Sequence, residues 1–362
     1  SIFWVNEKAA TGRYICSPGS AQMASICDFG ARANYMACRF EDVLAPCPSA
    51  SPLPLIGRKD QYGTLMGGAL ADHGASGLSA FATRDGLHAC YAMWQPEGDT
   101  GNAESWEKTM PVIYLGRRIR LDGGGMGRYR GGSAMDALWF IHPRSDPEIG
   151  GLSQGKFFTA FHGLMGGYPG DRAVMRIGRN TNLKELIDTG KPLPRGLGNE
   201  PGIRGDLKGD IDVDHRVNWR PEPAPPYTLF EVLQMGGSGF GDPLERDPEL
   251  ILQDLINGVV SRAASEQICG VVMEGDWANP RSLRCNVAET EERRAQMRAE
   301  RKRRGIPARE YIKRNREKIL NGDIPNYPRE MINSLLAFSP RWANWFRDEW
   351  GLPEDFKEVP EK

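Results

Sequence analysis

Gly236-Gly-Ser-Gly-Phe-Gly-Asp-Pro-Leu-Glu-Arg-Asp-Pro248 marks the point at which the sequence pattern changes from β-rich to helical. Its glycines suggest a phosphate-binding loop, but such a loop leads directly into a helix and usually carries a lysine. Here two Asp-Pro pairs follow the glycines, and their carboxylates would face any bound anion. We therefore interpret the stretch as a structural bend. It leads into a helix with Asp247 as the N-cap and Pro248 at the first helical position.

An earlier glycine-rich segment, Asp122-Gly-Gly-Gly-Met-Gly-Arg-Tyr-Arg-Gly-Gly132, lies between two strand-like runs. Met110–Leu121 and Ala134–Ile141 are rich in the apolar residues that favour β-strands. A glycine loop between two strands is a β connection, because a Rossmann crossover needs a helix after the glycines. Short β or loop pieces are expected to continue through residues 150–180.

Composition narrows the class of protein. The 362 residues carry 46 Lys and Arg against 47 Asp and Glu, a formal net charge of -1. This balance argues against a protein that binds nucleic acid or a membrane surface, which would usually be basic. The chain shows neither an apolar run of about 18 residues nor a basic leader, so we expect a cytoplasmic protein. The seven cysteines lack the close pairs of a zinc site and indicate reduced thiols.

The pattern along the chain predicts an α+β protein, with a β-rich mixed body containing glycine-rich loops and a helical C-terminal region. We divide it into a mixed body (1–187), a Pro/Gly-rich connecting segment without clear periodicity (188–235) and a helical part (236–362). In the last part, helices are predicted from Pro248 to about Asn257, after the cap Ser261, and over 289–304, 306–320 and 340–350.

Candidate site residues gather in the polar and aromatic segment 84–107, where Asp85, Glu97, Asp99, Glu104 and Glu107 accompany Trp94 and Trp106. Carboxylates held close together suit acid–base work or a hard metal ion. The alternative is a solvated loop with two core tryptophans. Among the five histidines, no two lie within four residues of each other, and His73, in a stretch of small residues, is the best candidate.

Several of these motifs resemble the sequence signatures of a known protein family. The segment 122–132 resembles the first glycine signature of the hydantoinase B/oxoprolinase family, and 236–248 resembles its C-terminal signature. Further stretches are similar to the large subunit of the family's ketone carboxylases, which act on acetone or acetophenone; they are Tyr91-Ala-Met-Trp-Gln-Pro-Glu-Gly-Asp-Thr-Gly101, Tyr114-Leu-Gly-Arg-Arg118, Gly163-Leu-Met-Gly-Gly-Tyr-Pro169 and Thr181-Asn-Leu-Lys-Glu185. The resemblance covers most of residues 63–355.

The resemblance implies an ATP-dependent ketone carboxylase, a ligase that acts as a multi-subunit complex. In such enzymes the enol oxygen of the ketone is phosphorylated, bicarbonate is activated as carboxyphosphate, and CO2 combines with the enolate to give a 3-oxo acid. ATP would bind to a hydantoinase-A-like subunit, and a small zinc subunit would complete the complex. Mn or Mg would also lie on other chains, so no metal ligand and no cofactor-binding residue is assigned to this chain.

Family members are markedly longer, and this chain resembles only their C-terminal half. Either a partner chain supplies the N-terminal half, or the sequence is part of a longer protein. Two other functions stay open. One is a subunit of an ATP-dependent hydantoinase or 5-oxoprolinase, an enzyme that opens cyclic amides. The stretch Trp94–Asp99 favours the carboxylase over this alternative. The other is a non-catalytic scaffold subunit, which the charged helices would suit.

Overall fold

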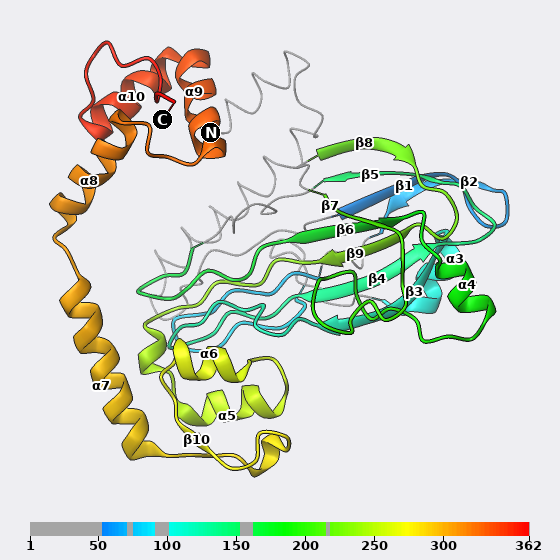
Figure 1. Cartoon of the computed structure of the whole chain (residues 1–362), viewed down its shortest axis with the longest axis horizontal. Helices are drawn as coiled ribbons and strands as arrows, with labels where there is room; N and C mark the ends of the chain where they lie inside the picture. Colours follow the sequence, from blue (N-terminus) through cyan, green and yellow to red (C-terminus); the bar gives the residue numbers. More distant parts are fainter. Residues whose placement is uncertain (1–52, 71–74, 91–100, 153–161, 215–217, 362) are drawn as a thin grey trace. The chain divides into compact units, whose positions relative to one another are not determined.

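A computed structural model describes residues 53–70, 75–90, 101–152, 162–214 and 218–361 (Figure 1). The chain divides into two compact units, Ser1–Arg294 and Ala295–Lys362. The described part of the first unit holds two larger antiparallel sheets, and the second unit is helical. The predicted α+β class, with helices mainly in the C-terminal region, is confirmed. The division at 187 and 235 stays a prediction.

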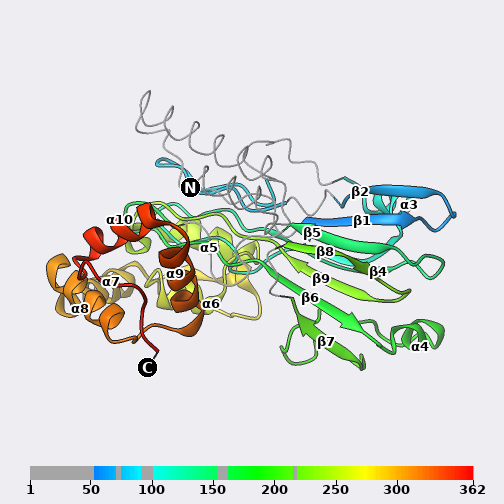
Figure 2. The ribbon, with the colours of Figure 1, turned by 90° about the horizontal axis from the view of Figure 1, so that it is seen from above.

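The two sheets contain strands from distant parts of the sequence (Figure 2). The four-stranded sheet has the order β2 (Leu65–Ala69), β1 (Leu53–Lys59), β5 (Glu148–Leu152), β8 (Asn218–Pro223). The five-stranded sheet has the order β3 (Val112–Ile119), β4 (Met135–Ile141), β9 (Leu229–Leu233), β6 (Val174–Arg179), β7 (Asp210–Val213). Antiparallel pairing of β3 with β4 confirms that the glycine segment between them is a β connection.

The main core lies between these sheets. Ile56 of β1 belongs to the same buried cluster as Trp139 of β4 and Phe230 of β9. The two aromatic rings, which are cross-strand partners, stack with centroids 4.5 Å apart. On the other face of the five-stranded sheet, Leu138 joins a second cluster with Leu183 of helix α4 (Leu183–Asp188). Since both faces of β4 are covered, all seven of its residues are buried, as its apolar sequence suggests.

The glycine-rich segments form a bundle of extended backbones that pack against one another. A Cβ on Gly236 would lie 1.6 Å from the carbonyl oxygen of Gly123, and one on Gly131 would lie 1.9 Å from that of Gly237. Hydrogen bonds join 123–132 to 236–241, to Leu78 and to 164–171, and the Ser79 hydroxyl accepts from the Ser238 N–H. The glycines are therefore needed because each backbone lies where a neighbouring side chain would be.

The helices after this bundle begin and end largely where the sequence indicates. Helix α5 (Pro248–Ile256) is capped by Asp247, whose carboxylate accepts from the Glu249 N–H, and helix α6 (Arg262–Gln267) by Ser261. Helices α7 (Val287–Arg304), α8 (Ala308–Leu320) and α10 (Pro340–Trp350) confirm the three predicted further on, and Gly351 ends the last at φ 59°. The short strands β10 (Met273–Glu274) and β11 (Arg284–Cys285) form a small antiparallel pair.

The sequence did not reveal every element. Helices α9 (Asn326–Phe338) and α3 (Ala103–Thr109) were not predicted. The connecting segment 188–235, in which the sequence shows no clear periodicity, contains strands of both large sheets: β7 and β9 belong to the five-stranded sheet and β8 to the four-stranded one. Strands β7 and β8 are terminal strands of their sheets, with a neighbour on one side only. The exposed residues of β7, with only Ile211 half-buried, explain why no apolar alternation was visible.

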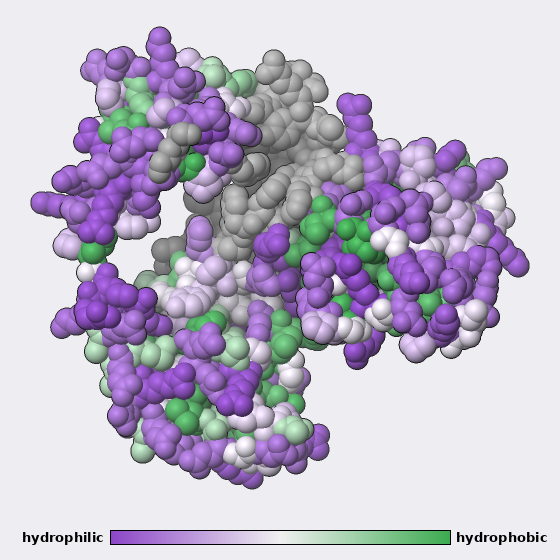
Figure 3. Space-filling view, in the orientation of Figure 1, coloured by the Kyte–Doolittle hydropathy of each residue, from purple (hydrophilic) through white to green (hydrophobic). Residues whose placement is uncertain are grey.

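The second unit has a small core of its own. Its buried residues include Ile319, Leu336 and Phe346, from α8, α9 and α10. Aromatic residues of α10 are part of this core, since Trp342 stacks on Phe346 with centroids 4.8 Å apart. In Figure 3 the surface over α7 and α8 is largely hydrophilic, which agrees with interleaved charges such as the Arg314–Glu310 pair.

Candidate functional site

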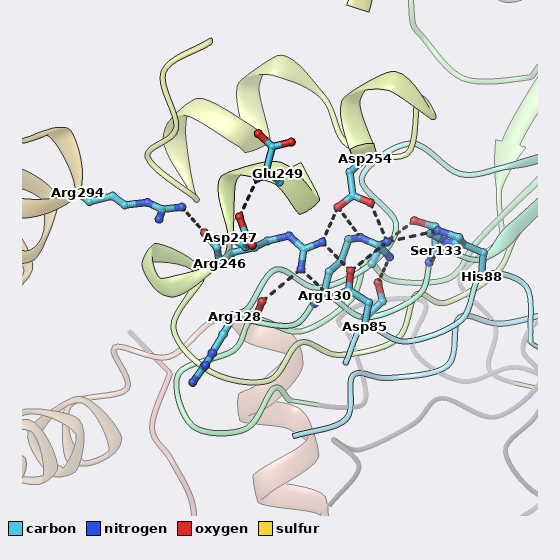
Figure 4. Close-up of polar contacts among 12 residues, drawn as sticks. Asp85, His88, Arg128, Arg130, Ser133, Arg246, Asp247, Glu249, Asp254 and Arg294 are labelled. Carbon is cyan, nitrogen blue, oxygen red and sulfur yellow. Dashed lines mark hydrogen bonds and ion pairs between the residues drawn. The ribbon is translucent and has the colours of Figure 1, made fainter. Parts of the chain in front are cut away.

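A buried ionic network joins the two glycine signatures and the segment before them (Figure 4). Its centre is Arg246, whose side chain is fully buried. Arg246 Nη1 and Nη2 each donate to one carboxylate oxygen of Asp85 at 2.7 Å. Nη2 also donates to Asp254 Oδ2 on α5, again at 2.7 Å. One guanidinium therefore connects two carboxylates that lie far apart in the sequence.

Arg130, in the first glycine signature, completes the network. Its Nε and Nη2 donate to the two oxygens of Asp254 at 3.0 and 2.9 Å, which is a bidentate pair. Its backbone N–H donates to Asp85 Oδ1 at 2.7 Å. Two carboxylates and two guanidinium groups thus balance each other. Burial of such charges is tolerable only with this degree of pairing and hydrogen bonding.

Electrostatics keep Asp85 and Arg246 ionised. Burial alone would raise the pKa of Asp85, but the hydrogen bond and charge of Arg246, helped by Arg130, lower it below its usual value. Burial opposes the charge of Arg246 too, yet contacts with Asp85 and Asp254 raise the pKa of this guanidinium. Asp85 is therefore a fixed anion at neutral pH and a poor general base.

His88 lies at the edge of the network. Its Nδ1 accepts from the Ser133 N–H at 2.9 Å, and its Nε2 lies 3.5 Å from Nη2 of Arg130. Burial, followed by the charge of Arg130, lowers the pKa of the imidazole. The ring is therefore held neutral, and its acceptor nitrogen fixes the backbone next to Gly132.

Helix α7 contacts the same region. Arg294, itself buried, donates to the carbonyl oxygen of Arg246 at 2.7 Å and to that of Cys269 at 2.9 Å. The network thus ties together α5, the part of α7 up to Arg294 and the glycine bundle. This arrangement positions backbone segments rigidly, as a scaffold for a site does.

The glycine stretch 236–241 offers no anion cradle. Every one of its six backbone N–H groups donates within the protein, to carbonyl oxygens of Asp171, Gly132, Tyr168, Tyr129 and Leu164 and to the hydroxyl of Ser79. A phosphate loop works through free N–H groups that point at the ligand. The interpretation as a structural bend is confirmed by these bonds.

The candidate residues from the sequence are not all brought together. Asp85 lies in the network. Glu104 is exposed in the first turn of α3 and takes no part in the hydrogen bonds and ion pairs of the network described above, while neighbouring Glu107 accepts from the Tyr114 N–H at 2.8 Å and ties α3 to β3. Trp106 packs against the main core, as the alternative interpretation expected. His73, Glu97 and Asp99 lie outside the described residues, so their role stays a prediction.

Sequence reasoning missed Arg130, Arg246 and Asp254. A signal was available, because both arginines sit inside glycine-rich signatures where a long side chain is unexpected. Asp254 lies among the buried apolar residues of α5 and is 5% exposed. A buried acid on an amphipathic helix requires a buried cation, but the sequence alone cannot identify that cation.

Two kinds of feature are absent from the described part of the chain. Within it, no group of three or more His, Cys, Asp or Glu side chains is arranged to hold a metal ion. Nor does any of the helices described here have the length and apolar character needed to cross a membrane.

Comparisons with known proteins agree on one group of relatives. The family model described as hydantoinase B/oxoprolinase matches residues 22–243. The acetone carboxylase alpha subunit of Xanthobacter autotrophicus is 34% identical over 294 residues, which cover 80% of this chain and 37% of that protein. The acetophenone carboxylase delta subunit of Aromatoleum aromaticum is 29% identical over 264 residues, covering 70% of this chain and 36% of that protein.

Solved structures extend the likeness to the fold. The nucleotide-free structure of acetone carboxylase matches with a TM-score of 0.76 and 31% identity, over 90% of this chain and 43% of that chain. The ATP-dependent caprolactamase from Pseudomonas jessenii matches with a TM-score of 0.52 and 20% identity, over 73% of this chain and 40% of that chain, and shows the fold alone. This chain thus matches less than half the length of each of these proteins.

Proposed function

The chain belongs to the hydantoinase B/oxoprolinase family, and on this basis we propose that it is a subunit of an ATP-dependent ketone carboxylase. The reaction would join a ketone such as acetone or acetophenone to bicarbonate and give a 3-oxo acid. It would proceed through a phosphorylated enol and carboxyphosphate. The observation that carries the proposal is the match to acetone carboxylase, in sequence over 80% and in structure over 90% of this chain.

The proposal places ATP on a different chain. The N–H groups of 236–241 are used within the protein, so this glycine-rich stretch supplies no phosphate loop. A hydantoinase-A-like subunit would bind ATP, a further segment or chain would supply the rest of the hydantoinase B fold, and a small subunit would carry zinc. Mn or Mg would be held outside the described residues of this chain, among which no metal cluster occurs.

The role of this chain would be to hold one side of the carboxylation site. The ionic network fixes the bundle of glycine-rich backbones. The polar and aromatic segment 84–107, which contributes Asp85 to this network, also carries Glu97 and Asp99. We propose these two, with Glu104, as carboxylates that face the site. Asp85 and His73 are weaker candidates, and the ionised, doubly paired state of Asp85 favours a positioning role.

Two other functions are weighed against this one. A cyclic amide hydrolase is supported by the family and by the fold shared with caprolactamase, though the identity of 20% shows no more than the fold. A non-catalytic scaffold is supported by the charge-rich surface of α7 and α8.

One experiment separates the three. The native complex is purified, its chains and metals are identified, and ATP- and bicarbonate-dependent loss of acetone or acetophenone is measured. A carboxylase gives a 3-oxo acid only with both co-substrates and contains a zinc-bearing small chain. ATP-driven opening of a cyclic amide without bicarbonate would sink the carboxylase proposal.

A second experiment tests the site residues. The double variant Glu97→Gln, Asp99→Asn is compared with Glu185→Gln on the exposed face of α4, in an intact complex. We expect at least about a hundredfold loss of kcat in the first, since a positioned acid or base contributes that much or more, and no change in the second. Unchanged turnover in the double variant would remove the site assignment and leave the scaffold function.

A further inference from the structure

A cavity with charged and apolar walls lies on the five-stranded sheet, away from the glycine bundle. Its volume is about 350 Å³, and strands β3, β4 and β9 form its floor. A loop that contains Leu193, Pro194 and Arg195 forms its wall. It faces the side of β4 that carries Leu138, opposite to the core between the two sheets.

Two buried carboxylates line this cavity. Asp136 of β4 is 5% exposed and Glu231 of β9 is 3% exposed. Glu231 has a cationic partner, because Nη1 of Arg176, its cross-strand neighbour on β6, donates to its Oε2 at 2.5 Å. Asp136 is underpaired: its Oδ2 lies 3.4 Å from Nε of Arg118, and its Oδ1 is buried without a hydrogen-bond partner among the described residues.

An unsatisfied carboxylate oxygen is costly in a protein interior, where it loses its hydration. The carboxylate torsion of Asp is broad and two-fold, so either oxygen can turn toward the cavity. Asp136 therefore offers the cavity a strong acceptor that the described residues leave unused.

The rim of the cavity is positively charged. Arg117, Arg118 and Arg195 line it, against the two carboxylates. Arg176 neutralises Glu231 from outside the lining, and the guanidinium of Arg195 is exposed and has no ion-pair partner among the described side chains. The excess of positive charge attracts an anion, and guanidinium groups match oxyanions in shape.

We propose that this cavity binds a protic oxyanion, a group that carries a negative charge together with an O–H donor, such as hydrogenphosphate or hydrogencarbonate. The anionic oxygens pair with Arg118 and Arg195, and the O–H donates to Asp136. An aprotic oxyanion such as sulfate has no donor and would place its charge against the buried carboxylate. The cavity therefore selects for the proton as well as for the charge.

Size and lining extend the ligand class. A water molecule takes up about 30 Å³ in the liquid, so a cavity of about 350 Å³ has room for more than a small ion. The remaining walls are apolar, from Leu115, Leu138 and Leu193. A small organic phosphate or an activated carboxylic acid has the matching chemistry, with its oxyanion at the arginines and its carbon part on the leucines.

The electrostatics of Asp136 support its role as the acceptor. Burial raises the pKa of Asp136 to about 6; the charges of Arg120 and Arg118 oppose this rise, and Glu231 adds to it. Above this pKa the ionised form of Asp136 predominates, so near neutral pH the O–H donor comes from the ligand. The charged groups that surround the site are Arg117, Arg118, Arg120, Arg176, Arg195, Asp136 and Glu231.

Calorimetric titration of the purified protein with sodium phosphate, bicarbonate or sulfate, at one ionic strength and near neutral pH, tests the proposal. The unaltered protein should bind phosphate or bicarbonate at least about tenfold more tightly than sulfate, the factor expected for one charge-assisted hydrogen bond. Whichever of the two protic ions binds more tightly identifies the source of the oxyanion. Asp136→Asn, whose amide can donate, should reduce this preference to about unity.

Two exposed arginines give a matched pair of variants. Arg195→Gln, at the rim, should weaken phosphate or bicarbonate binding about tenfold, whereas Arg144→Gln, outside the cavity, should leave it unchanged. Equal binding of phosphate, bicarbonate and sulfate by the unaltered protein would overturn the proposal, as would unaltered binding in Arg195→Gln or no binding at millimolar concentration. The proposal does not rest on the carboxylase function, because binding is measured without turnover.

Discussion

Arg246 and Asp85, which are 161 residues apart in the sequence, form a bidentate ion pair with both N–O distances at 2.7 Å. The pair links the second glycine signature to the segment that precedes the first. Asp254 and Arg130 extend it on the other side, so that no charge in the group of four lacks a counter-charge.

The first prediction concerns this pair. Arg246→Ala should lower the free energy of unfolding by about 3–5 kcal/mol, because it removes the bidentate partner of half-buried Asp85 and leaves Arg130 as the one remaining cation for Asp85 and buried Asp254. Urea titration monitored by circular dichroism measures the change. The control is Arg262→Ala, which removes the exposed pair with Glu266 and should cost less than about 1 kcal/mol. Equal losses in the two variants would show that the network is not the stabilising element.

The second prediction concerns the glycine bundle. Gly236→Ala should prevent normal folding or cost more than about 3 kcal/mol, since its Cβ would lie 1.6 Å from a backbone oxygen that cannot move alone. In Gly116→Ala on β3, nothing lies within 4 Å of the added Cβ. Thermal unfolding of this second variant should stay within a few degrees of the unaltered protein. A well-folded Gly236→Ala protein would contradict the packing described above.

The third prediction concerns pH and His88. Because the pKa of this imidazole is lowered from 6.5 in the folded protein, the unfolded chain binds a proton more readily. Stability from this group is therefore complete above about pH 6.5 and falls as the pH decreases through the folded-state pKa. In His88→Asn, whose side-chain oxygen can still accept from the Ser133 N–H, this part of the acid sensitivity should vanish. Unfolding curves of both proteins between neutral and mildly acidic pH make the comparison.

The fourth prediction concerns Asp136, whose contribution to stability changes with pH in the direction opposite to that of His88. The folded-state pKa of Asp136 is raised to about 6, so the folded protein holds its proton more tightly than the unfolded chain does. The associated stability is present below about pH 4 and is lost as the pH rises through 6. Asp136→Asn should therefore stabilise the ligand-free protein above pH 6, by about 2–3 kcal/mol at most, and have little effect at pH 4. Destabilisation at both pH values would mean that Asp136 is already satisfied.

The fifth prediction concerns thiol reactivity. Cys269 is fully buried, and burial raises its pKa to about 11, so little thiolate forms and access is blocked. In the native protein, peptide mapping after treatment with a thiol reagent should find Cys269 unlabelled and half-buried Cys285 labelled faster. Rapid labelling of Cys269 would show that α6 and the following turn open readily.

Much of the fold followed from local sequence. Asp247-Pro248, Ser261 and Gly351 marked helix ends correctly, because capping depends on one side chain and its own backbone. The strands before and after the first glycine signature were confirmed for the same kind of reason, since apolar runs bounded by glycines have few alternatives. Strands β7 and β8 were not predicted, because a strand at the edge of a sheet is stabilised by pairing with its neighbour and need not show apolar alternation of its own.

The sequence by itself determined the family signatures, the helix caps and the absence of a phosphate loop after residue 236, since each depends on residues that are close along the chain. Only the tertiary structure decided what Arg130, Arg246 and Asp254 do, and that Asp136 and Glu231 share one cavity. The physical reason is that the role of a buried charge depends on the group with which it pairs. These partners lie on strands, helices and loops that meet only when the chain folds.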